Sequence, residues 1–194
     1  MAPRALPGIF CLEGQWGKRL DDRASVLPTL ELLERIAIAT FIHRDFGTRE
    51  ELSHYIAKWG QLGYQKYGVL YLAAHGVKGA IQVGRGAITL DELADVIDGT
   101  ARGRTVYFGS CDVMRDKSGV AKFRKETGAK LVCGYTKTVE WLDSAAFDLM
   151  LLRSLVSNNR VDKRVNDVLR DYPDLSRRLG FHSERAPVRG SGTS

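Results

Sequence analysis

Two apolar segments of the chain each stop abruptly at a reactive side chain. Segment 68–74 is followed by His75, and segment 105–110 is followed by Cys111. If both are parallel strands of one sheet, the imidazole and the thiol emerge at the same carboxyl edge, where open α/β sheets place their binding sites. A cysteine with a nearby histidine is the minimum set of groups for a thiolate nucleophile. We therefore predict a candidate catalytic pair at one sheet edge.

The rest of the sequence alternates short apolar segments with amphipathic ones, which predicts an α/β fold. Strands are expected at 8–14, 38–43, 69–74, 105–109 and 130–134, and helices at 25–36, 48–62, 89–97, 118–128, 144–156 and 161–172. Residues 80–83 and 87–90 alternate in hydrophobicity around a Gly-Arg-Gly turn, which indicates a small hairpin after the His75 strand. The expected architecture is a mostly parallel central sheet with helices on both faces.

The length of 194 residues fits one domain with a substantial core, and we expect this domain to span residues 1–175. Residues 176–194 end in a Gly/Ser-rich stretch and carry four arginines against one acid, Glu184. They are therefore expected to form a basic, flexible tail that is solvated. Neither this tail nor the net charge of +6 by itself indicates a nucleic-acid-binding protein.

The composition, with 44% hydrophobic and 27% charged residues, is typical of a globular protein. The longest apolar segment, 149–152, is far too short to span a bilayer, and the N-terminal residues lack the apolar core of a signal peptide. We expect a cytoplasmic protein without a membrane partner. The cysteines Cys11, Cys111 and Cys133 are odd in number, and no Cys-x-x-Cys pair exists. Neither a disulfide framework, nor a metal site, nor a cofactor is predicted.

Cys111 and His75 could each be a buried residue at the end of a strand. Their occurrence at the ends of consecutive strands favours catalysis instead. Gly76 adjoins the histidine and Gly109 shortly precedes the cysteine, and glycine permits the close backbone approach that a peptide site needs. His43 also ends an apolar segment, but it lacks such neighbours. The sequence contains neither a phosphate-binding P-loop nor a Gly-x-Ser-x-Gly elbow.

These two segments resemble the clan CD cysteine peptidases, which include caspases, separases and bacterial CHAT-domain proteases. The matching runs are Tyr71-Leu72-Ala73-Ala74-His75-Gly76 and Tyr107-Phe108-Gly109-Ser110-Cys111. Residues 132–137 followed by Trp141 are similar to the strand and loop after the CHAT cysteine. The resemblance covers about residues 8–156 and implies a caspase-like fold. The short domain is similar to proteases encoded beside bacterial gasdermins.

The sequence also departs from the caspase pattern. The Gln-Ala-Cys-Arg-Gly signature is absent, and Asp112 follows the cysteine. The interval from His75 to Cys111 is shorter than the about 50 residues of caspases. The resemblance therefore does not imply cleavage after aspartate.

The resemblance implies a cysteine endopeptidase. Cys111 would attack the scissile carbonyl as a thiolate, and His75 would act as general base and acid. The backbone N–H groups of Gly76 and Cys111 would bind the oxyanion. No third member of a catalytic triad is evident.

Loops around the cysteine strand and the next strand build the substrate pocket in this fold. Here they carry Asp112, Glu140 and Asp143 as candidate substrate-binding residues. Acidic side chains would favour Arg or Lys at P1, the substrate residue on the amino side of the scissile bond.

The resemblance also suggests a protein substrate, such as a gasdermin in bacterial antiviral defence, and an activator protein. Two other function classes stay open. One is a catalytically silent caspase-like interaction module, which an electrophilic peptide probe would fail to label at Cys111. The other is a thiol hydrolase or acyltransferase that acts on small molecules. Nucleic acid is not an expected partner.

Overall fold

The computed structural model describes residues 5–157 and 161–186. The main sheet has six strands in the order β2-β1-β3-β7-β8-β9. Its strands are β1 (Gly8–Gly14), β2 (Thr40–Phe46), β3 (Tyr67–Ala73), β7 (Thr105–Phe108), β8 (Leu131–Tyr135) and β9 (Phe181–Arg185). All neighbouring pairs are parallel except β8 and β9, which are antiparallel.

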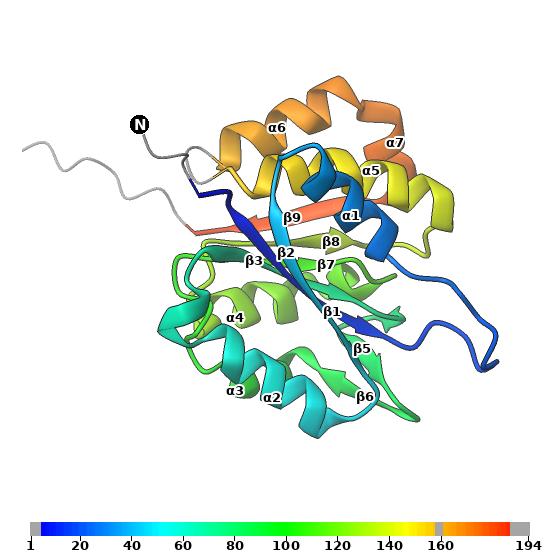
Figure 1. The fold of residues 1–194 in the computed structure, drawn as a ribbon, viewed down its shortest axis with the longest axis vertical. Helices are drawn as coiled ribbons and strands as arrows, with labels where there is room; N and C mark the ends of the chain where they lie inside the picture. The colour runs from blue at the N-terminus through cyan, green and yellow to red at the C-terminus, as the bar shows by residue number, and fades with distance from the viewer. Residues whose placement is uncertain (1–4, 158–160, 187–194) are drawn as a thin grey trace, which may run out of the picture.

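Helices cover both faces of this sheet (Figure 1). One layer consists of α1 (Leu27–Arg35), α5 (Trp141–Leu155), α6 (Val161–Asp171) and α7 (Pro173–Leu179), and the other of α2 (Arg49–Trp59), α3 (Leu90–Ile97) and α4 (Lys117–Thr127). Short 3₁₀ turns lie at Leu62–Tyr64 and Val113–Arg115. Successive strand side chains point to opposite faces, so Phe10 and Leu12 join one core while Ile9 and Cys11 join the other. The predicted mostly parallel α/β sheet is confirmed.

A second, three-stranded antiparallel sheet follows β3 directly. It consists of β4 (Gly76–Val77), β5 (Ala80–Val83) and β6 (Gly86–Thr89). The turn between β5 and β6 includes Gly84, whose φ of 57° is a left-handed conformation that glycine adopts readily. The hairpin predicted around the Gly-Arg-Gly turn is confirmed.

Helix starts follow local side-chain chemistry. The hydroxyls of Thr48 and Thr89 accept the backbone N–H of Glu51 and Glu92, and each glutamate closes a capping box. The helix predicted from 118 starts at Lys117, because Asp116 accepts the Gly119 N–H. No helix within the described residues combines the length and hydrophobicity needed to cross a bilayer.

The predicted flexible tail from residue 176 is wrong as far as residue 185. Pro173 begins α7, where its missing N–H costs nothing. Strand β9 then pairs with β8 along its whole length. The ring of Phe181 packs against Phe147 and Tyr135, with 5.3 Å and 6.5 Å between the ring centroids, respectively. The folded unit therefore extends past the boundary expected at 175, while residues 187–194 lie outside the described part.

The arginines of this segment form ion pairs on the surface. Arg178 lies 2.9 Å from Asp143, and Arg185 lies 3.7 Å from Asp162. Arg177 pairs with Asp174. These three arginines are therefore paired with acids of the folded domain.

Candidate active site

His75 and Cys111 meet at the carboxyl edge of the main sheet. Strands β3 and β7 are parallel neighbours in register from Val69 opposite Thr105 to Leu72 opposite Phe108. The two residues therefore leave the sheet side by side, and both line one pocket of about 260 Å³. The sheet topology brings together the two side chains that the sequence singled out.

The backbones that follow the two strands are packed tightly. A Cβ on Gly76 would collide with the carbonyl oxygen of Cys111 and would lie 2.7 Å from a methyl of Val113. Ser110 is buried, and its hydroxyl accepts the Ala74 N–H at 3.3 Å. Only glycine at position 76 permits this approach, which holds the histidine segment against the cysteine segment.

A backbone carbonyl orients the imidazole of His75. Its Nε2 lies 2.5 Å from the carbonyl oxygen of Trp16, in the loop after β1. A carbonyl can only accept, so Nε2 carries the proton and Nδ1 is left as the basic atom. The Trp16 ring also packs edge-on to His75 at 5.2 Å and to Trp141 at 4.9 Å between ring centroids.

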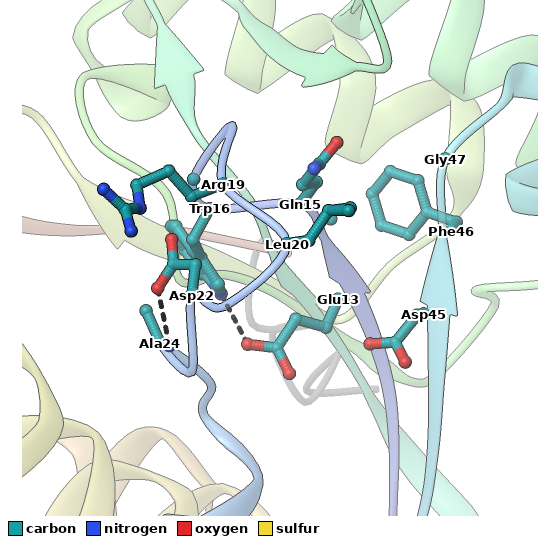
Figure 2. Close-up of a pocket in the computed structure, with 12 residues that line it drawn as sticks. Glu13, Gln15, Trp16, Arg19, Leu20, Asp22, Ala24, Asp45, Phe46 and Gly47 are labelled. Carbon is teal, nitrogen blue, oxygen red and sulfur yellow. Dashed lines mark hydrogen bonds between the residues drawn. The ribbon is translucent and has the colours of Figure 1, made fainter.

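A buried carboxylate holds this loop in place. Glu13, at the end of β1, accepts hydrogen bonds from Trp16 Nε1 at 2.5 Å, from Ser25 Oγ at 2.7 Å and from the Val26 N–H at 2.8 Å. His43 Nε2 lies 2.6 Å from Oε2, the same oxygen that accepts from Ser25. Figure 2 shows Glu13 reaching Trp16, with Asp45 on the neighbouring strand. Glu13 thus fixes the peptide whose carbonyl binds His75.

The protonation of Glu13 reflects these contacts. Burial alone would raise its pKa, but the hydrogen bonds from His43, Trp16, Ser25 and Val26 outweigh burial and lower the pKa below 4.5. The carboxylate is therefore ionised at neutral pH.

The sulfur of Cys111 differs in environment from the other two thiols. Cys111 is partly exposed, and its Sγ lies 3.4 Å from the Val139 N–H. A donor aimed at sulfur supports negative charge on a thiolate. Cys11 and Cys133 are fully buried, and burial raises the pKa of both thiols well above 9.0. Among the three cysteines, Cys111 is the one placed for nucleophilic chemistry.

The three acids expected to bind substrate have other partners. Asp112 has a left-handed φ of 58° and accepts from Thr138 Oγ1 at 3.0 Å. Glu140 caps α5 by accepting the Asp143 N–H, and Asp143 forms the ion pair with Arg178. None of these three side chains lines the pocket that holds Cys111.

Among the described residues that line this pocket, the acidic one is Asp148 of α5. Its carboxylate contacts the hydroxyls of Tyr71, Tyr107 and Tyr135, one from each of the strands β3, β7 and β8. The Tyr71 and Tyr107 rings stack at 4.9 Å between centroids. The sequence reasoning missed Asp148, although a carboxylate among the apolar residues of α5 is a signal that could have found it.

Glu13 and Trp16 were missed as well. The available signal was a charged residue inside an otherwise apolar strand, since all seven residues of β1 are buried. Glu13, His43 and Asp45 also offer ligand atoms within 4.8 Å of one another. Because the Glu13 oxygens already accept four hydrogen bonds, we assign this cluster to holding the loop.

Two open hollows adjoin His75 on the side of the hairpin. They measure about 720 Å³ and 520 Å³, and both are bordered by Gln82 and Arg85. Together with the pocket at Cys111, they leave space on both sides of the histidine.

Comparisons with known proteins agree with this fold. The model of a family of unknown function, DUF6642, matches residues 7–183. No curated protein matches the sequence. A solved structure of a secreted C11 cysteine protease from Bacteroides thetaiotaomicron, in complex with an irreversible peptide inhibitor, is similar with a TM-score of 0.57 and 8% identity. The match covers 84% of this chain and 57% of that one, so this chain spans little more than half of that protease. The likeness shows a caspase-like fold.

Proposed function

The chain belongs to the DUF6642 family, which has no assigned function, and we propose that it is a cysteine endopeptidase with Cys111 as nucleophile. The observation that carries this proposal is the placement of His75 and Cys111. They follow neighbouring parallel strands and line the same pocket. A thiol and an imidazole on one pocket are the groups that thiolate catalysis requires.

The geometry of His75 supports a definite proton path. Nε2 donates to the Trp16 carbonyl, so Nδ1 accepts the proton of the Cys111 thiol. The thiolate then attacks the scissile carbonyl, and His75 returns the proton to the leaving amine. Water hydrolyses the resulting thioester with His75 again as base.

We further propose that the N–H groups of Gly76 and Cys111 stabilise the oxyanion. The close backbone packing of these two residues supports this assignment. Each such donor contributes about 3–4 kcal/mol in comparable sites.

An extended peptide fits the surroundings better than a small amide does. The open hollows beside His75 continue the surface beyond the pocket at Cys111. From the sequence we further propose that the chain is a CHAT-like protease of the cytoplasm. Its substrate would be a protein such as a gasdermin, and an activator protein would act on the protease.

Replacing Cys111 by Ala tests the proposed function. We expect the wild type to cleave members of a peptide library and to be labelled at Cys111 by a peptidyl vinyl sulfone. Cys111→Ala should do neither, while its circular dichroism and melting temperature stay unchanged. Cys133→Ala, which removes a buried thiol, is the matched control and should retain both activities.

Undiminished cleavage by Cys111→Ala would overturn the assignment. A wild type that is labelled at Cys111 but cleaves no peptide would point to a thiol enzyme for small substrates. A wild type without labelling or cleavage would favour the silent interaction module.

A further inference from the structure

We propose that the pocket beside Cys111 selects a cationic side chain, Arg or Lys, and that Asp148 is the counter-charge at its base. This inference rests on the proposed endopeptidase function, because the cationic side chain would be the P1 residue of the substrate.

Asp148 lies at the bottom of the pocket rather than at its rim. The residue is 5% exposed, yet it lines the same pocket as His75 and Cys111. Gly109, two residues before the nucleophile, also lines the pocket, and a Cβ there would collide with the ring of Tyr71. Because position 109 carries no side chain, the buried Tyr71 and Asp148 line the pocket directly.

The hydroxyls around Asp148 are arranged to support a negative charge. Tyr71 donates to Oδ2 at 2.6 Å, and the hydroxyls of Tyr107 and Tyr135 lie against Oδ1. An ionised carboxylate accepts about four hydrogen bonds, so Oδ2 can accept from a further donor. The tyrosines supply dipoles but no positive charge.

Within residues 5–157 and 161–186, no lysine or arginine forms an ion pair with Asp148. Burial raises the pKa of its carboxyl above the usual value, and the hydrogen bonds from Tyr107, Tyr135 and Tyr71 offset this only in part, so a cation beside the carboxyl would favour its charged form. Buried charges in proteins are nearly always paired with an opposite charge. Because Asp148 lines the base of the pocket, the side chain of a bound peptide can supply a positive charge beside it.

The walls of the pocket suit a long basic side chain. Trp16, Trp141 and Tyr71 line it, and aromatic surfaces bind both the aliphatic stem and the charged head of Arg or Lys. An apolar P1 side chain would cover the carboxylate without neutralising it, and an acidic one would be repelled. The pocket therefore discriminates by charge.

Peptides that differ only at P1 test this inference. We expect kcat/KM for a P1 Arg peptide to exceed that for its neutral isostere citrulline by about 100-fold or more, since an unpaired buried charge is costly. Asp148→Asn should reduce this ratio to within about tenfold. Asp143→Asn, on the same helix but outside the pocket lining, is the matched control and should keep the ratio.

Binding to Cys111→Ala separates this inference from the proposed function. By calorimetry, the Arg peptide should bind this variant at least about tenfold more tightly than the citrulline peptide. If nothing is cleaved but this preference holds, the pocket assignment stands and the peptidase assignment fails. If peptides are cleaved with Arg and citrulline equal, or with Leu or Asp preferred, the pocket assignment fails. The Arg and citrulline comparison needs no substitution at 148, so it decides even if Asp148→Asn does not fold.

Discussion

At the scale of single residues, the proposed catalytic pair depends on a carboxylate that touches neither His75 nor Cys111. Glu13 binds the indole of Trp16, and the Trp16 carbonyl binds His75. Its other hydrogen bonds tie the same loop to the start of α1 and to β2. Glu13 is therefore a positioning residue for His75, the proposed general base.

Glu13→Gln should lower kcat about 10- to 100-fold, because a small displacement of the base is enough to slow the reaction by this much. KM should change little, since the pocket base is built by other residues. Rates should be normalised to the fraction of protein that a Cys111-directed probe labels. Asp45→Asn, an exposed carboxylate beside Glu13, is the control that should leave kcat unchanged.

The same variant has a predicted pH signature. The lowered pKa of Glu13 means that the carboxylate stabilises the fold above pH 4.5 and loses this contribution as pH falls through the lowered pKa. Glu13→Gln should therefore cost free energy of unfolding at pH 7, by about 1–3 kcal/mol, and less near pH 3. A difference that is independent of pH would contradict this role.

At the scale of elements, the ends of β3 and β7 place the reactive groups through backbone packing. Residue 76 begins β4, and its Cα lies against the Cys111 carbonyl. The site is therefore built by the exits of two neighbouring strands, not by a single loop.

Gly76→Ala should reduce peptide cleavage at least about 100-fold, because the new methyl must push the two strand exits apart. Gly63→Ala is the matched control, since a Cβ there meets no atom within 4 Å. Cleavage assays of the two variants at equal folded fraction would check this. Equal rates for both would show that the close approach has no catalytic role.

The elements also show what the sequence could reveal. The strands that end at His75 and Cys111 were predictable, because each is a local apolar run followed by its reactive residue. Strand β9 was not, since all five of its residues are only partly buried and its alternation is weak. Its stability comes from pairing with β8 and from Phe181 against Phe147, contacts between residues remote in sequence.

The residues of the candidate site also divide into those that the sequence could reveal and those that it could not. His75, Cys111 and Gly76 could be recognised from short motifs. Trp16 and Asp148 reach the pocket from the loop after β1 and from α5, and no local pattern connects these segments. The sequence predicted that Asp112, Glu140 and Asp143, which lie near the nucleophile along the chain, supply the acidic groups of the pocket. In the structure these acids bind their own neighbours instead.

At the scale of the whole molecule, α7 and β9 complete the sheet and the layer of α5 and α6. A chain that ends after residue 175 should therefore lose at least about 3 kcal/mol of unfolding free energy, because it exposes β8 and removes the buried Leu179. Chemical denaturation would measure this loss. A chain that ends after residue 186 is the control and should match the full-length protein. Equal stability of the shorter chain would restore the tail boundary at 175.

The antiparallel direction of β9 has a practical consequence. Gly8 opens β1 beside Tyr67, and Arg185 closes β9 opposite Leu131, so both lie at the amino edge of the sheet. The pocket lies at the opposite edge, and Figure 1 shows both ends of the coloured chain on one side of the molecule. An affinity tag, a fluorescent reporter or a surface tether joined close to Gly8 or Arg185 would therefore start at the edge of the sheet away from the pocket, which makes these two positions suitable for immobilised assays.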